Sequence, residues 1–178
     1  MKYFIFVTGI FWFIANSLYS QEPTNTKKAG PQMVLKEQNL RQGRIRYKVA
    51  EEYFNDGFYS ASIKKITELL YLFPKHPMEL KSLQLLSKAF KKNDQLVESI
   101  HVDMEIYRKY STTEDGLNAY LDAGRKTVKI GDIEKAKKIL NEIKHQVYSS
   151  KLAKDAEIEL EQLEILEGNF SIPKPSLN

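Results

Sequence analysis

The side chains that could perform chemistry are few in this chain of 178 residues. His101 and Glu105 are four residues apart and would share one face of a helix, with Asp103 close by. Two such groups do not complete a zinc site, and no HExxH pattern is present. We therefore expect all three to be exposed polar positions of a helix, and we predict no metal site.

Other kinds of catalytic or cofactor site also lack their residues. There is no cysteine, which excludes disulfides, thiolate metal sites and thiol nucleophiles. No glycine cluster has the GxGxxG or GxxxxGK spacing of a nucleotide-binding loop. His76 lies in a loop between prolines and His145 lies near a helix end, so both are expected to be structural. We predict no catalytic residues and no cofactors.

The elements that carry the remaining polar side chains are predicted to be helices. Between Leu117 and Val147, apolar residues recur at steps of three and four on both sides of Gly131. This spacing predicts two antiparallel helices joined by a short turn. Gly124 lies inside the first helix at a cost of about 1 kcal/mol relative to alanine. A close crossing against the small residue Ala136 would explain this glycine.

The pattern in this helix pair resembles a tetratricopeptide (TPR) repeat, a helix-turn-helix unit of about 34 residues. The resemblance departs from the family at Tyr120, Thr127 and Tyr148, where Trp, Tyr and Pro are usual. It implies an all-α solenoid that binds a protein or peptide partner without catalysis. The residues that carry the resemblance are Tyr120, Ala123, Gly124, Gly131, Ile133, Ala136, Leu140 and Ile143.

Two further copies of the unit precede this pair. Residues 44–74 contain a turn at Gly57, and residues 77–110 contain a turn at Asn93-Asp94. Gly57 and Gly131 are 74 residues apart, which we interpret as two 34-residue periods plus six. We expect the extra residues at the end of the middle repeat's first helix and in the loop 111–116, because insertions belong in loops.

Residues 151–167 carry one more apolar stripe and are predicted to be a capping helix, which ends the array of about three repeats. This helix holds six acidic residues. We expect them to form a solvated outer face, and an acidic docking helix is the alternative. Two prolines follow and prevent a partner helix, so residues 168–178 are predicted to be a disordered tail.

The N-terminal region reads as a targeting segment. Residues 1–20 have a lysine, an apolar run and then small polar residues, as in a cleaved signal peptide. Residues 21–31 read as a disordered linker, and residues 32–167 as the TPR-like helical domain, with Gly43 as a candidate helix break. The predicted location is the periplasm or cell envelope. This layout also resembles exported bacterial envelope TPR proteins.

The TPR resemblance also implies where a partner would bind. In that family, fixed positions of the first helix of each repeat line a groove, and we map them with first helices starting at Gly43, Pro77 and Leu117. Because five of the fifteen mapped positions are basic and one is acidic, we expect the groove to bind an acidic or amphipathic partner segment. The implied partner-binding residues are Arg44, Tyr47, Phe54, Lys81, Lys88, Asn118, Arg125 and Lys129.

A second interpretation uses the net charge of +4 and the basic run Arg41, Arg44, Arg46 and Lys48. With an uncleaved N terminus, these residues would hold the protein at an anionic membrane surface. An ordinary solvated helix face explains the same run. Nucleic acid is not a predicted partner, because the chain is predicted to be exported.

Overall fold

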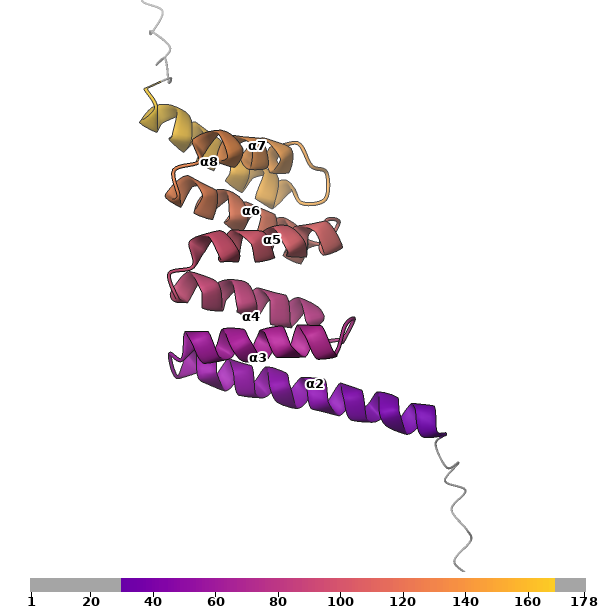
Figure 1. Ribbon diagram of the computed structural model, residues 1–178. Helices are drawn as coiled ribbons and strands as arrows, with labels where there is room; N and C mark the ends of the chain where they lie inside the picture. Colours follow the sequence, from indigo (N-terminus) through magenta and orange to yellow (C-terminus); the bar gives the residue numbers. More distant parts are fainter. Residues whose placement is uncertain (1–29, 169–178) are drawn as a thin grey trace, which may run out of the picture. The chain divides into compact units, whose positions relative to one another are not determined.

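The computed structural model describes residues 30–168, and this part of the chain consists of helices and short connections without a β-strand. The prediction of an all-α fold is therefore confirmed (Figure 1). The helices are α2 (Pro31–Asn55), α3 (Tyr59–Leu72), α4 (Glu79–Lys92), α5 (Leu96–Tyr110), α6 (Glu114–Lys129), α7 (Ile133–Lys144) and α8 (Ser150–Leu166).

The chain divides into two compact units, one up to Lys36 and one from Glu37 onward. The first unit is described only from Gly30 through the first turns of α2. The predicted signal peptide, the linker up to residue 29 and the tail from residue 169 lie outside the described residues.

Within the second unit, consecutive helices run antiparallel and pack in chain order (Figure 1). α5 packs against both α4 and α6, and α7 packs against both α6 and α8. α6 and α8 therefore run in the same direction, and they also touch each other. A helix in the middle of this order is covered on two faces, which explains why α6 buries most of its length.

Residues with positive φ angles follow the first helix of each pair and also follow α8, and they recur with a constant spacing. They are Gly57, Asp94, Gly131 and Gly168, with φ angles of 83°, 59°, 85° and 73°, and each lies 37 residues after the one before it. The expected 34-residue period with six surplus residues is therefore wrong, since every repeat carries three extra residues. Asp94 adopts the left-handed backbone conformation at a position where the other turns have glycine, so the glycines alone do not reveal the 37-residue period.

The close crossing predicted at Gly124 is present, with different neighbours. Gly124 is buried, and a Cβ atom added to it would lie 3.1 Å from Ile139 Cγ2 and 3.4 Å from Leu140 Cδ2. These residues lie one turn beyond the expected partner Ala136.

In the two preceding pairs, the residue at the position of Ala136 is a serine. Ser62 Oγ donates to the Ala50 carbonyl at 2.7 Å, and Ser99 Oγ donates to the Ser87 carbonyl at 2.8 Å.

Gly43 does not break its helix, contrary to the prediction, because α2 continues through it. A Cβ atom at Gly43 would lie 2.5 Å from His76 Nε2. His76 is buried; its Nδ1 accepts from the Met78 backbone N–H at 3.1 Å, so the proton is on Nε2, which donates to the Leu40 carbonyl at 3.1 Å. The glycine thus makes room for a histidine that fastens the α3–α4 loop to α2.

Candidate functional site

Two adjoining pockets open along α4, α6 and α8, the first helices of successive pairs. The α6–α8 pocket has a volume of about 590 Å³, and the α4–α6 pocket has a volume of about 300 Å³. Lys91, Asp122 and Lys126 line both pockets, so the two form one continuous groove. This groove is the candidate site.

The α6–α8 pocket has an apolar floor. Leu140 and Leu163 line it and belong to the hydrophobic cluster at this end of the fold, and Val128 lines it and packs against that cluster. Two apolar side chains of α8 lie at its edge, since Ile158 is 43% exposed and Leu166 is 81% exposed. Exposed apolar residues beside a pocket favour binding of another apolar surface.

The charges that line the two pockets are balanced. The basic residues are Lys88, Lys91, Arg125, Lys126 and Lys129, and the acidic residues are Asp103, Asp115, Asp122, Asp155 and Glu159. The acidic residues Asp155 and Glu159 come from α8, which was not included in the predicted groove. The basic excess that the sequence predicted is therefore offset within the groove itself.

Arg125 is already paired within the protein. Its guanidinium lies 2.6 Å from Glu159 and 3.3 Å from Asp122. Burial acts to lower the pKa of Arg125, but these two carboxylates act in the opposite direction and leave that pKa raised. Arg125 therefore fastens α6 to α8 and is not a free charge for a partner.

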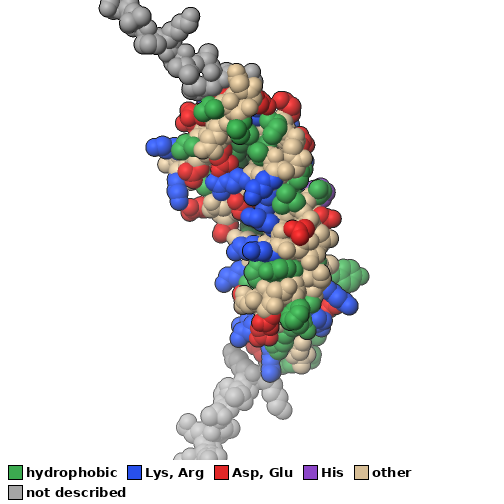
Figure 2. Space-filling model, turned by 90° about the vertical axis from the view of Figure 1, so that its left-hand side faces the viewer, with side chains coloured by type: hydrophobic (Ala, Val, Ile, Leu, Met, Phe, Trp, Pro, Cys, Tyr) green, Lys and Arg blue, Asp and Glu red, His purple; other side chains and the backbone are tan. Residues whose placement is uncertain are grey.

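Three lysines of the groove remain unpaired with the described residues: Lys88, Lys91 and Lys129 are exposed and form no ion pair within 30–168. Figure 2 shows lysine and arginine side chains gathered over the middle helices on one face of the molecule. On α8, Asp155 likewise forms no ion pair with a described residue. The groove charges without an ion pair to a described residue are thus lysines on α4 and α6, Asp155 on α8, and Asp115 on α6, which accepts a hydrogen bond from Gln84 at 2.9 Å.

The predicted site residues divide between the groove and the rest of the surface. Lys88 and Asn118 line the α4–α6 pocket, and Arg125 and Lys129 line the α6–α8 pocket. The other four line neither pocket, and they are Arg44, Tyr47, Phe54 and Lys81.

Tyr47 and Phe54 contribute to packing near α3. Tyr47 donates to Glu51 at 3.1 Å, and burial together with this carboxylate raises the pKa of Tyr47 to about 12. The Phe54 ring lies 5.5 Å from the Tyr59 ring. Both side chains pack against the hydrophobic cluster of α2 to α6.

The mapping of the middle repeat is three residues too early. With the 37-residue spacing, the position of Gly43 and Leu117 falls on Leu80, not on Pro77. In the corrected register the mapped lysines of this repeat are Lys81, Lys88, Lys91 and Lys92, and of these Lys88 and Lys91 line the groove. Sequence reasoning missed Lys91, and the turn at Asp94 was the signal that could have found it.

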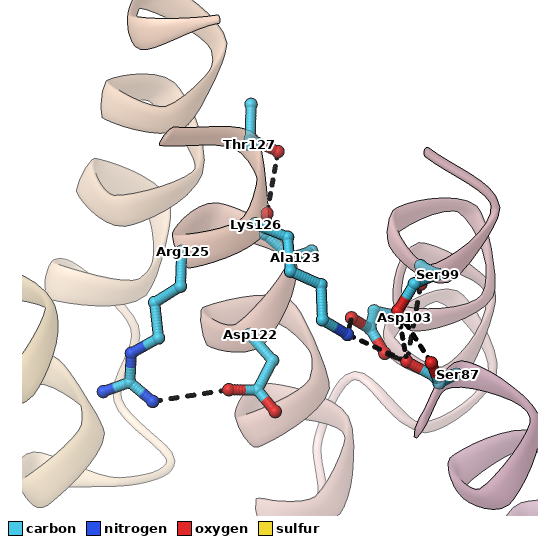
Figure 3. Close-up of polar contacts among 8 residues, drawn as sticks. All are labelled: Ser87, Ser99, Asp103, Asp122, Ala123, Arg125, Lys126 and Thr127. Atoms are coloured by element: carbon cyan, nitrogen blue, oxygen red, sulfur yellow. Dashed lines mark hydrogen bonds and ion pairs between the residues drawn. The ribbon is translucent and has the colours of Figure 1, made fainter. Parts of the chain in front are cut away.

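A buried polar cluster lies beneath the groove and consists of Ser87, Ser99, Asp103 and Lys126 (Figure 3). The Lys126 ammonium donates to Asp103 and, at 2.9 Å, to Ser87 Oγ. Ser87 Oγ in turn donates to Asp103 and lies 3.1 Å from Ser99 Oγ. The cluster joins α4, α5 and α6 by hydrogen bonds at the centre of the described fold.

The burial of Asp103 corrects the expectation that it is an exposed helix residue. Asp103 is 3% exposed and Lys126 is 5% exposed. Burial raises the pKa of Asp103, against the opposing effect of Lys126 and Ser87. The residues 37 positions before and after Asp103 are Ile66 and Leu140, so an ion pair here replaces the apolar contacts of the neighbouring repeats. His101 is exposed, as expected.

Arg125 and Lys126 are adjacent in α6 but form their contacts with different helices. Figure 3 shows Arg125 and Lys126 pointing in opposite directions, with Lys126 directed at Asp103. Lys126 Nζ has three hydrogens and two acceptors among its described contacts, Asp103 and Ser87. Its side chain also lines both pockets.

The acidic residues of α8 do not form a purely solvated face, contrary to the expectation. Glu159 pairs with Arg125, Glu167 pairs with Lys137, and Glu157 lies 3.0 Å from Lys144. These pairs join α8 to α6 and α7, beside the apolar contacts of its buried stripe. Much of the acidity of α8 therefore fastens the last helix to the fold.

Within residues 30–168, no group of three or more His, Asp or Glu side chains is arranged to hold a metal ion. No helix in this range is both long enough and apolar enough to cross a membrane. The sequence matches no protein-family model, and a search of curated proteins finds no significantly similar sequence.

Proposed function

We propose that this protein is a TPR-like α-solenoid that acts as a non-enzymatic protein-interaction module and binds an amphipathic segment of a partner protein. The observation that carries the proposal is the α6–α8 pocket. It combines an apolar floor and the exposed residues Ile158 and Leu166 with a charged rim. A segment with one apolar face and charged flanks matches this combination.

The repeating geometry supports the TPR-like part of the proposal. Antiparallel helix pairs follow one another with the same turn every 37 residues. Small residues recur where the two helices of each pair cross, at Ala50, Ser87 and Gly124. The period is three residues longer than the 34 residues usual in the TPR family. The proposed likeness to that family therefore applies to the arrangement of the helices and the position of the groove, and does not extend to the repeat length.

The charge balance of the groove favours an amphipathic partner over a strongly acidic one. Equal numbers of basic and acidic side chains line the two pockets, and Arg125 is neutralised by Glu159 and Asp122. Long-range steering of an acidic partner needs a surplus of one sign. Apolar contact at the α6–α8 pocket therefore supplies most of the proposed binding energy.

The proposed location is the bacterial cell envelope, and it rests on the signal-like order of residues 1–20. Intact-mass measurement of the protein recovered from its native cell tests it. The expected mass lacks a segment ending between Ser17 and Gln21. Recovery of the uncut chain would contradict export with cleavage.

A membrane-surface role is the alternative function, because Arg41, Arg44 and Lys48 are exposed on α2. Arg46 is less available, since its guanidinium lies over the Phe73 ring at 5.9 Å. Sedimentation with anionic and neutral liposomes distinguishes the two functions. Binding to anionic liposomes that is lost in the Arg41→Glu/Lys48→Glu variant would favour the membrane role.

The main test compares two neighbouring substitutions on α8. Leu166→Asp places a charge in the α6–α8 pocket, whereas Ile165→Asp places the same charge on a neighbouring exposed side chain that does not line the pocket. Affinity purification from envelope extract is done with the parent and both variants. We expect a co-purifying protein to be lost with Leu166→Asp and kept with Ile165→Asp. Equal retention by both variants would refute the pocket as the site.

A further inference from the structure

We infer that the partner segment is a helix that lies antiparallel to α6 and α8, with acidic residues in its first turn and basic residues in its last turn. This inference rests on the proposed function. It is carried by the order of charges along the α6–α8 pocket and by the common direction of the two helices that form it.

The unpaired charges of the pocket lie at opposite ends. The contact between Arg125 and Glu159 shows which levels of α6 and α8 face each other. Asp155 is one helical turn before this contact, and it is unpaired with described residues. Lys129 is one turn beyond the contact, and the pocket also takes in Lys91 on that side of α4. The pocket is therefore negative at one end and positive at the other.

The helix dipoles favour the same orientation. α6 ends at Lys129 and α8 ends at Leu166, so the carbonyl ends of both helices lie together (Figure 1). A helix N-terminus carries a partial positive charge and a C-terminus a partial negative charge. A partner helix is thus favoured with its N-terminus beside these carbonyl ends.

Charge and dipole together fix the composition of the partner. Acidic side chains near its N-terminus would meet Lys91 and Lys129, and basic side chains near its C-terminus would meet Asp155. Acidic first turns and basic last turns also stabilise the partner helix itself. The pocket extends along α8 from Asp155 to Leu166, about 16 Å at 1.5 Å per residue, which corresponds to about three turns of partner helix.

Three synthetic peptides of equal length and identical apolar stripe test this inference. The first has Glu in its first turn and Lys in its last turn, the second has these charges exchanged, and the third has Gln at all of these positions. Their affinities for the full chain are measured by fluorescence anisotropy at low and high salt. We expect the first peptide to bind most tightly and to lose this advantage at high salt.

Variants of the protein assign the effect to particular residues. Lys91→Glu/Lys129→Glu should weaken binding of the first peptide by about tenfold and leave the Gln peptide nearly unchanged. Lys138→Glu is the control, because Lys138 is an exposed lysine of α7 that does not line the pocket. A photo-reactive group at the peptide N-terminus should cross-link near Leu166, and one at the C-terminus near Asp155.

The outcomes separate this inference from the proposed function. Equal binding of all three peptides, with loss in Leu166→Asp, would overturn the charge order and leave the proposed function standing. A cross-link from the peptide N-terminus to the Asp155 region would overturn the antiparallel orientation. Binding that Leu166→Asp does not affect, or no binding of any peptide, would overturn both.

Discussion

Replacing both members of the buried ion pair by leucine should leave the protein as stable as the parent or more stable. The neighbouring repeat provides the template, because Leu140 and Leu163 lie 37 residues after Asp103 and Lys126 and are buried in contact with one cluster. Buried ion pairs replaced by apolar residues of similar volume are often neutral or stabilising by about 1 to 4 kcal/mol. We expect Asp103→Leu/Lys126→Leu to fall in this range.

Each single substitution should be far more damaging than the pair. Lys126→Leu leaves the Asp103 carboxylate buried with only Ser87 as a side-chain donor, and we expect a loss of about 3 to 5 kcal/mol. Asp103→Leu should cost less than Lys126→Leu, because Lys126 lines both pockets and its ammonium can turn toward water. Urea unfolding followed by circular dichroism gives the free energy of each variant.

The pH dependence of unfolding tests whether the buried Asp103 carboxylate causes the stability loss of Lys126→Leu. Burial raises the pKa of Asp103, and Lys126 opposes this effect, so Lys126→Leu raises the folded-state pKa further above the unfolded value. A raised folded pKa adds stability at low pH that is lost as pH rises through that pKa. The cost of Lys126→Leu should therefore shrink as pH falls from about 7 toward 4.

Additivity would refute this reasoning. If the double variant lost the sum of the two single losses, the two residues would not interact, and the polar cluster would not act as a unit. Lys129→Leu serves as the control, since Lys129 is exposed and unpaired with described residues, and it should change stability by less than about 0.5 kcal/mol.

Three further predictions concern backbone positions. Gly43→Ala should destabilise the protein by about 1 to 3 kcal/mol despite the better helix propensity of alanine, because the added Cβ would collide with the His76 ring. A denaturant titration measures this loss, with Arg41→Ala as the control. Asp94→Gly should stabilise by about 1 kcal/mol, since φ is 59° there; an unchanged melting temperature would contradict this. Gly124→Leu should cost about 1 to 3 kcal/mol or more by overpacking against Ile139, and a melt like that of the parent would refute the crossing.

The existence and direction of the helices could be predicted from the sequence. Apolar residues at steps of three and four define the stripes, and short turns at Gly57 and Gly131 require the flanking helices to be antiparallel. These signals are local, because each depends on residues within one or two turns. The 37-residue spacing was also present in the sequence, but it was hidden by Asp94 at a position where the other turns have glycine.

The tertiary structure decided which polar residues are exposed. A periodic stripe predicts one buried face, whereas a helix inside this stack is covered on a second face by the next helix. Asp103 lies on the face of α5 that α6 covers, and Lys126 lies on the opposing face of α6, so the spacing within α5 alone indicated an exposed position for Asp103.

The balance of charge in the groove could not be predicted from the sequence pattern either. Arg125 and Glu159 are 34 residues apart and meet only because α7 folds α8 back beside α6. Local spacing gives the face of a helix on which a charge lies, and the partner of that charge depends on which other helix is packed there. The helices and their turns were therefore determined by the sequence read locally, while the balance of charge in the pocket was decided by packing between helices distant in the chain.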